Sequence, residues 1–209
     1  MNNNPVLPLF YKGNQLVSEG KWKTNPYTFL LQIYFLNIRF KMMKQAMKEN
    51  DNVLDRSIYE DRLFMKMNYD LGNTTKPEWD IYQSLLANMM EELPYAAHKK
   101  APDLMVLIKV DYPTMLKRIE KRGRPYEQPT KNNSLTTYYK NLIKYYAVWA
   151  KHYDASPLLI IDGNQYDFMG SHHDLKIVLG KIDRALKKKV IIYYGSSLFS
   201  STVLQPATD

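Results

Sequence analysis

Apolar residues recur every three or four positions over much of the chain, which is the spacing that gathers them on one face of a helix. The clearest stretch runs from 26 to about 48, where Phe29, Ile33 and Leu36 share a face and Pro26 stands near the first turn. The same spacing predicts further helices over residues 59–67, 76–93, 113–122, 134–153 and 174–186. A short helix is also expected where apolar residues crowd between 6 and 11.

Other apolar runs are too short for most helices and predict strands. Residues 104–110 and 157–163 contain uninterrupted runs, which are typical of strands buried on both faces of a parallel sheet. Val53 and Leu54 are interpreted as the end of another buried strand, and residues 190–194 as one more. Strands that alternate with helices predict an α/β fold, and 209 residues suffice for one domain, with a small lid or insertion at most.

The polar triplet Asp55, Arg56 and Ser57 follows Leu54, at the point where strand is expected to give way to helix. Open α/β sheets place their ligand-binding and catalytic residues at such points, at the carboxyl ends of the strands. Arg56 could donate two hydrogen bonds to phosphate oxygens, and Asp55 could hold a metal-bound water or take a proton. The alternative is a capped helix, with Ser57 or Asp55 as N-cap and Arg56 in solvent, and the triplet alone favours neither interpretation.

Two further groups of polar residues stand out. Gln32 and Arg39 lie two turns apart on the apolar face of the 26–48 helix, so this face is expected to line a polar pocket. Arg118 and Arg122 gather with Lys121 at the end of a helix that Gly123 closes. Such a cluster usually marks a solvated helix end, but it also fits a mobile phosphate clamp.

Composition narrows the classes of function. The chain is 45% hydrophobic with a net charge of +8, and apart from residues 117–124 and 187–189 the basic residues are spread evenly. Anionic small molecules account for this charge as well as nucleic acid does. The chain has no Cys, which excludes disulfides and thiolate metal sites, and its four His have no partner at a ligand spacing. Without a signal pattern or a membrane span, a cytoplasmic protein is expected.

Five segments together resemble the deoxynucleoside kinase family, and within it the bacterial deoxyadenosine/deoxyguanosine kinase branch. They are residues 4–11, 29–37, 55–61, 115–128 and 161–168, and they follow the family's order between residue 4 and about 186. The resemblance implies a three-layer α/β domain with a parallel sheet over residues 1–186 and a lid at about 117–128. It also implies transfer of the γ-phosphoryl group of ATP, with Mg²⁺, to the 5′-hydroxyl of a deoxynucleoside, for which a purine is expected. The implied partners are a deoxynucleoside or its monophosphate, and a second copy or a related kinase subunit as a dimer partner.

Carried over position by position, the resemblance implies a nucleoside pocket. Gln32 and Asp61 resemble the residues that hydrogen-bond the base, with Arg39 nearby. Phe29 would stack near the base. Tyr11 and Glu127 resemble the residues that hold the sugar 3′-hydroxyl.

The resemblance also implies a phosphoryl-transfer site. Arg56 resembles the arginine that orients the 5′-hydroxyl and the transferred group, and Asp55 is its acidic neighbour. Arg118, Arg122 and Arg124 resemble the lid arginines that neutralise charge on the phosphoryl oxygens.

Family members place a strand, a Gly-rich phosphate loop and a second, acidic strand before the part that matches here. No Gly-x-x-x-x-Gly-Lys-Ser/Thr pattern occurs among the eight Gly of the 209 residues. We therefore expect the acceptor half of a kinase site, and very slow transfer by this chain alone. Three explanations stay open: a start at an internal Met, a natural truncation, and replacement of the lost element by the C-terminus.

The alternatives to a kinase belong to other functional classes. A chain that keeps the pocket and lacks transfer would be a nucleoside- or nucleotide-binding pseudokinase. A basic nucleic-acid-binding protein rests on the charge alone, since no RNP-like, zinc or helix-turn-helix pattern accompanies it.

Residues 187–209 extend beyond the family match. Residues 190–194 are apolar enough for a strand that replaces the missing one, and Gly195 falls where a phosphate loop would start. The alternative is a frayed tail after the last helix.

Overall fold

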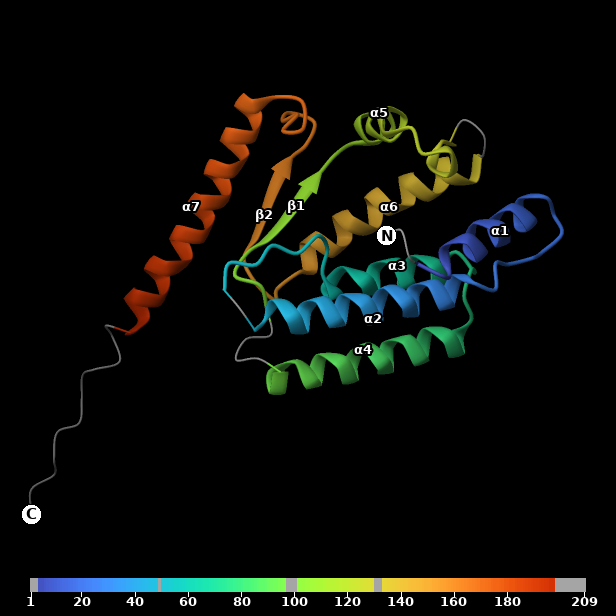
Figure 1. Ribbon diagram of the computed structural model, residues 1–209, viewed down its shortest axis with the longest axis horizontal. Coiled ribbons are helices and arrows are strands. Elements are labelled where there is room, and N and C mark those ends of the chain that lie inside the picture. Colours follow the sequence, from blue (N-terminus) through green and yellow to red (C-terminus); the bar gives the residue numbers. More distant parts are fainter. Residues whose placement is uncertain (1–3, 49, 97–100, 130–132, 198–209) are drawn as a thin grey trace, which may run out of the picture. The chain divides into compact units, whose positions relative to one another are not determined.

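The computed structural model describes residues 4–48, 50–96, 101–129 and 133–197, which form helices and two strands (Figure 1). The chain divides into two compact units. We call residues 1–100 and 112–152 the helical unit, and residues 101–111 and 153–209 the strand unit.

The helical unit is built around α3, which packs against three other helices. Its elements are α1 (Leu7–Ser18), α2 (Thr28–Ala46), α3 (Ile58–Asp70), α4 (Lys76–Ala96), α5 (Tyr112–Arg122), the 3₁₀ turn η1 (Pro125–Glu127) and α6 (Asn133–His152). Helix α3 contacts α2, α4 and α6, while α1 packs on α2 and α5 on α6 (Figure 1). The core between α2, α3 and α4 consists of Leu36, Met43, Ile58, Met65, Trp79 and Tyr82. The helices predicted from apolar spacing in this unit are confirmed with most ends shifted by a few residues, and α1 is longer than the short helix predicted between residues 6 and 11.

Polar residues fix where the helices begin. Ser57 is the N-cap of α3 and forms a capping box with Glu60, so the predicted cap at Ser57 is confirmed. The Oδ1 atom of Asn4 accepts hydrogen bonds from the backbone N–H groups of Val6 and Leu7 at the start of α1, at 2.9 and 3.2 Å. These side chains satisfy N–H groups that the first turn of a helix leaves without a partner.

The strand unit holds two parallel strands and one long helix. Strands β1 (Met105–Lys109) and β2 (Leu158–Asp162) pair in parallel from Met105 opposite Leu158 to Lys109 opposite Asp162. Helix α7 (His172–Ser197) packs against β2 (Figure 1). The predicted strands are confirmed, but burial on both faces is not, because Ile108 and Ile160 are 45% and 50% exposed. In the part of the chain that the structure describes, each strand has a single neighbour, so one edge of each stays open.

Two predicted strands are wrong. Residues 52–54 are irregular, and Val53 is 96% exposed, because no described strand lies beside this segment to form a ladder. Residues 190–194 are helical and belong to α7, which runs past the predicted end at 186. A helix already formed extends by one hydrogen bond per residue, which outweighs the modest strand preference of Val and Ile. Residues 190–194 therefore do not form a replacement strand, and residues 198–202 of the supposed loop lie outside the described residues.

No helix of the described residues is long and apolar enough to cross a membrane.

Candidate nucleoside and phosphate site

The functional residues predicted from the sequence all belong to the helical unit. They come from α1, α2, the start of α3, α5 and η1. The structure joins several of them into two groups, one at the start of α3 and one at the end of α5.

Arg39 and Asp61 form a buried ion pair between α2 and α3. Their side chains are 11% and 2% exposed. Burial lowers the pKa of the Arg39 guanidinium, with a further lowering by Arg56 and an opposing effect from Glu60. Both carboxylate oxygens of Asp61 are buried; Arg39 Nη1 pairs with Oδ1, and no described donor hydrogen-bonds Oδ2. The prediction that Arg39 lies near Asp61 is confirmed.

The other predicted base and sugar contacts lie on α1 and α2. Gln32 is buried at 8% exposure, and no hydrogen bond holds its amide within the described part of the chain. Phe29 is half-buried and packs against the core cluster. Tyr11 is half-buried on α1, with its ring edge against Phe10 at 5.8 Å between centroids. The structure therefore places Gln32 and Phe29 on the same helix as Arg39, without a contact to Asp61 that would test their roles.

Arg56 adopts a backbone conformation that is rare for a residue with a Cβ. Its φ of 68° lies in the left-handed region, which costs about 1–2 kcal/mol relative to ordinary conformations. Its guanidinium lies 4.9 Å from the centre of the Phe64 ring. Arg56 is exposed, as the capped-helix interpretation of this triplet predicted, and so is the preceding Asp55. Strain of this kind gathers at functional sites, where the surrounding structure over-determines it.

Tyrosines of α6 complete the surroundings of Arg56. Burial raises the pKa of Tyr138, and raises that of Tyr146 to about 12, while the guanidinium of Arg56 opposes both shifts. The hydroxyl of Tyr146 donates to Glu60 Oε1 at 3.4 Å. Sequence reasoning missed Glu60, Tyr138 and Tyr146, although Ser57 followed three positions later by Glu60 is the sequence pattern of a capping box.

The second group joins two lid arginines to Glu127. Arg122 Nη2 lies 2.5 Å from Glu127 Oε2, and Arg124 Nη1 lies 3.3 Å from Glu127 Oε1. The hydroxyl of Tyr139 donates to the backbone carbonyl of Glu127 at 2.9 Å. Burial raises the pKa of Tyr139 to about 12, and the nearby Glu127 carboxylate adds to this effect. Arg118 lies one turn earlier than Arg122 on α5 and is half-buried.

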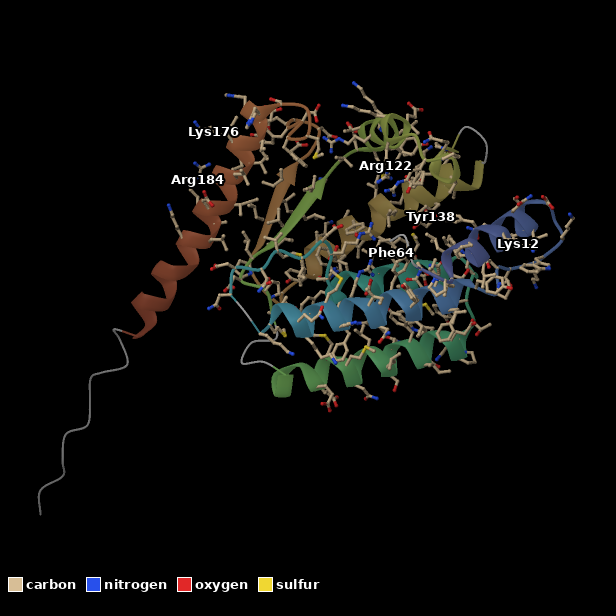
Figure 2. All side chains as sticks on the ribbon, viewed as in Figure 1. Lys12, Phe64, Arg122, Tyr138, Lys176 and Arg184 are labelled. Carbon is tan, nitrogen blue, oxygen red and sulfur yellow. The ribbon has the colours of Figure 1, made fainter. Side chains whose placement is uncertain are left out.

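Helix α6 links the two groups through neighbouring tyrosines. The guanidinium of Arg56 opposes the rise in the pKa of Tyr138, and the guanidinium of Arg122 opposes the rise in the pKa of Tyr139. The two rings meet edge to face at 5.5 Å between centroids. Figure 2 labels Phe64, Tyr138 and Arg122, which come from α3, α6 and α5 respectively. Arg56 thus lies near Tyr138 and Arg122 near Tyr139, and guanidinium groups are suited to binding an anionic group.

Residues 3–187 match the family described as deoxynucleoside kinase. The chain belongs to the deoxynucleoside kinase family. The resemblance found in the sequence is therefore confirmed. The match takes in every residue of the two groups described above.

Curated relatives agree with this assignment. The chain is 52% identical to a deoxyguanosine kinase of Lactobacillus acidophilus over 188 residues, which is 90% of this chain and 78% of that protein. It is 46% identical to a deoxyadenosine kinase of the same organism, over 90% of this chain and 82% of the relative. A deoxyadenosine/deoxycytidine kinase of Bacillus subtilis is 32% identical over 87% of this chain and 76% of the relative. Deoxynucleoside kinase is the function these relatives support, and the pseudokinase and nucleic-acid-binding alternatives are not favoured.

Solved structures of deoxynucleoside kinases share the fold. The structure of deoxyadenosine kinase from M. mycoides with bound dATP matches with a TM-score of 0.64 and 28% identity, over 88% of this chain and 83% of that one. The same kinase with bound dCTP matches with a TM-score of 0.63 and 26% identity, over 88% and 82% of the two chains. The fold is thus the α/β fold of these kinases, with a small parallel sheet in the described residues.

Proposed function

We propose that this deoxynucleoside kinase binds a purine deoxynucleoside in the helical unit and transfers the γ-phosphoryl group of ATP to its 5′-hydroxyl. The buried pair of Arg39 and Asp61 carries the proposal, because Arg39 pairs with Oδ1 of Asp61 and leaves the buried Oδ2 atom without a described hydrogen-bond donor. The names of the relatives that are about half identical, a deoxyguanosine and a deoxyadenosine kinase, support a purine.

Base recognition follows from what each side chain can offer. An ionised Asp61 only accepts hydrogen bonds, while the Gln32 amide both donates and accepts. A purine edge that carries an N–H or amino group beside a ring nitrogen complements this pair. Arg39 pairs with Asp61 and fixes its position, and Phe29 offers a ring for stacking. A base that leaves these buried groups unpaired is penalised, which provides specificity.

Sugar and phosphoryl groups would meet the remaining residues. We assign the 3′-hydroxyl to Tyr11 and Glu127, since a carboxylate accepts from a sugar hydroxyl. Arg56 orients the 5′-hydroxyl and the transferred group, with Asp55 beside it. The lid residues Arg118, Arg122 and Arg124 stabilise charge on the phosphoryl oxygens, which is the main task of a protein in this reaction.

ATP and Mg²⁺ are the co-substrate and the metal that the family implies. The exposed guanidinium groups of Arg122 and Arg124 fit the phosphates of ATP, whose γ-phosphoryl group Mg²⁺ would neutralise further. The described residues hold no group of three His, Cys, Asp or Glu side chains that could bind a metal ion. The three-layer sheet, the cytoplasmic location and a dimer with a second copy or a related kinase subunit stay predictions.

Calorimetry and a transfer assay test the function separately. The purified chain is titrated with deoxyguanosine, deoxyadenosine, deoxycytidine and thymidine and with their monophosphates, and is then assayed with ATP and Mg²⁺. We expect the tightest binding for a purine. Absence of heat with all eight compounds would overturn the pocket, whether or not transfer is observed. A preference for thymidine would overturn the purine assignment alone.

A further inference from the structure

Arg56 needs a structural support that its own backbone does not provide. With φ at 68°, this residue lies outside the regions that a side chain with a Cβ prefers. Left alone, the segment before α3 would relax to an ordinary conformation and turn the guanidinium away. Contacts on either side of Arg56 must therefore hold it.

Glu60 supplies these contacts with both of its carboxylate oxygens. Its Oε2 accepts from the backbone N–H of Ser57 at 2.8 Å and from the Ser57 hydroxyl at 3.0 Å. Its Oε1 accepts from the hydroxyl of Tyr146 at 3.4 Å. Glu60 is buried at 9% exposure, so these bonds form where water competes little. The residue that immediately follows Arg56 is thus fixed to the first turn of α3 and, through Tyr146, to α6.

The guanidinium end of Arg56 is connected to α6 through Phe64. Phe64 lies under the guanidinium, and its ring contacts that of Tyr146 edge to face at 6.0 Å between centroids. Trp149, one turn after Tyr146, donates its indole N–H to the backbone carbonyl of Tyr59 at 3.1 Å. Helix α6 is therefore fastened to the first turn of α3 beside Arg56.

We propose that Glu60 is a positioning residue for the reaction, which holds Arg56 in its left-handed conformation and aims the guanidinium at the phosphoryl group. The inference rests on the role of Arg56 in the proposed function. It adds a buried carboxylate that acts through Arg56 and Tyr146 and does not touch the substrate.

The chain contains its own control for this proposal. Helix α4 begins with the same capping box, in which Glu78 Oε2 accepts from the Thr75 backbone N–H at 2.6 Å and from the Thr75 hydroxyl at 2.8 Å. That box is exposed and no arginine precedes it. A role limited to helix capping would make Glu60 and Glu78 equivalent for activity. A positioning role makes only Glu60 matter.

The test compares Glu60→Ala, Glu78→Ala and Arg56→Ala by calorimetry with deoxyguanosine and its monophosphate. The ratio of the two affinities reports how well Arg56 meets a phosphate, and it requires no turnover. We expect Arg56→Ala and Glu60→Ala to lower this ratio about tenfold or more, and Glu78→Ala to leave it unchanged.

Each outcome decides a different point. A ratio that falls in Arg56→Ala but not in Glu60→Ala overturns the positioning role. A ratio unchanged in Arg56→Ala removes the phosphate role of Arg56, and with it both the proposed function of that residue and this inference.

Conservative variants guard against misfolding. Glu60→Gln keeps a capping side chain and should recover much of the ratio, while Tyr146→Phe should lower it and Tyr145→Phe should not, since Tyr145 bonds to Asp70 instead. If Glu60→Ala does not fold, equal ratios in Tyr146→Phe and Tyr145→Phe overturn the proposal.

Discussion

At the scale of single residues, the buried charges of the helical unit depend on one another. Arg39 and Asp61 lost their hydration when α2 and α3 came together, and each now depends on the other. Such a pair contributes little net stability compared with apolar residues, but removing one partner leaves a buried charge unpaired.

Replacement of Asp61 by Asn should therefore be costly. We expect Asp61→Asn to lower the free energy of unfolding by about 3 kcal/mol and the affinity for a purine deoxynucleoside at least tenfold. Urea denaturation and calorimetry measure the two effects. Asp80→Asn breaks the exposed pair of Asp80 with Lys76 and should change neither. Equal effects of the two substitutions would contradict a special role for the buried pair.

Gly13 on α1 packs directly against the side chain of Asn25. A Cβ at Gly13 would lie 2.2 Å from the Oδ1 atom of Asn25. Asn25 cannot easily move, because its amide nitrogen donates to the carbonyl of Phe10 and to Asn14 at 2.8 and 2.7 Å. Gly13→Ala should destabilise the chain by about 1–3 kcal/mol in urea denaturation.

Gly180 provides the matched control for this substitution. It also lies in a helix, and an added Cβ would meet only the tip of the Arg184 side chain at 4.0 Å. Gly180→Ala should stabilise the strand unit by up to about 1 kcal/mol, because Ala is the better helix former. Stabilisation by Gly13→Ala would show that Asn25 does not pack as described.

At the scale of elements, α5 and η1 bring the lid arginines together with Glu127. Gly123 ends α5 with a φ of 70°, and the chain then turns so that Glu127 faces back toward Arg122 and Arg124. Tyr139 and the Gln128 side chain hold the backbone of this turn, the latter by donating to the carbonyl of Ile119 at 3.1 Å. The turn therefore presents one carboxylate to two guanidinium groups and, in the proposed function, to a sugar hydroxyl.

The role of Glu127 can be tested with a nucleoside that lacks the group it binds. The chain should bind deoxyadenosine about tenfold more tightly than 2′,3′-dideoxyadenosine, because the 3′-hydroxyl donates to a charged acceptor. Glu127→Gln should bind the two nucleosides about equally in calorimetry. A preference for deoxyadenosine that survives in Glu127→Gln would contradict the role of Glu127 and leave the 3′-hydroxyl to Tyr11. Glu120→Gln on the exposed side of α5 is the control.

At the scale of the whole molecule, buried tyrosines link stability to pH. Burial raises the pKa of Tyr139 and Tyr146 from 10 to about 12, and raises that of Tyr82 further in the same direction. Between these values the unfolded chain has released phenol protons that the folded chain still binds. Stability is therefore fully present below pH 10 and falls as pH rises from 10 to about 12.

We expect alkaline unfolding in which these tyrosines ionise together with loss of the fold. Phenolate absorbance and circular dichroism, recorded on the same titration, should change in parallel for this group. Tyr146→Phe should make the loss of stability with pH less steep. Ionisation of every tyrosine near pH 10 in a chain that stays folded would contradict the burial described for α6.

Local patterns determined much of this protein. The apolar spacing predicted the helices because helical hydrogen bonds join residues four positions apart. The pattern of one helix face is therefore visible within a short stretch of sequence. The cap at Ser57 was predictable for the same reason, and the family emerged from five short segments in a fixed order. The candidate residues themselves, such as Arg39 and Asp61, were also found from the sequence.

Only the tertiary structure decided how distant residues meet. Tyr146 reaches Glu60 across 86 positions, and Tyr139 meets Glu127 from another helix. The sequence did not predict the exposed Val53 or the helical residues 190–194, because a strand needs a partner that no local pattern supplies. It also did not predict the left-handed conformation of Arg56. Short-range hydrogen bonds are encoded where they form, whereas a ladder, a buried ion pair or a strained residue exists only when packing brings its partners together.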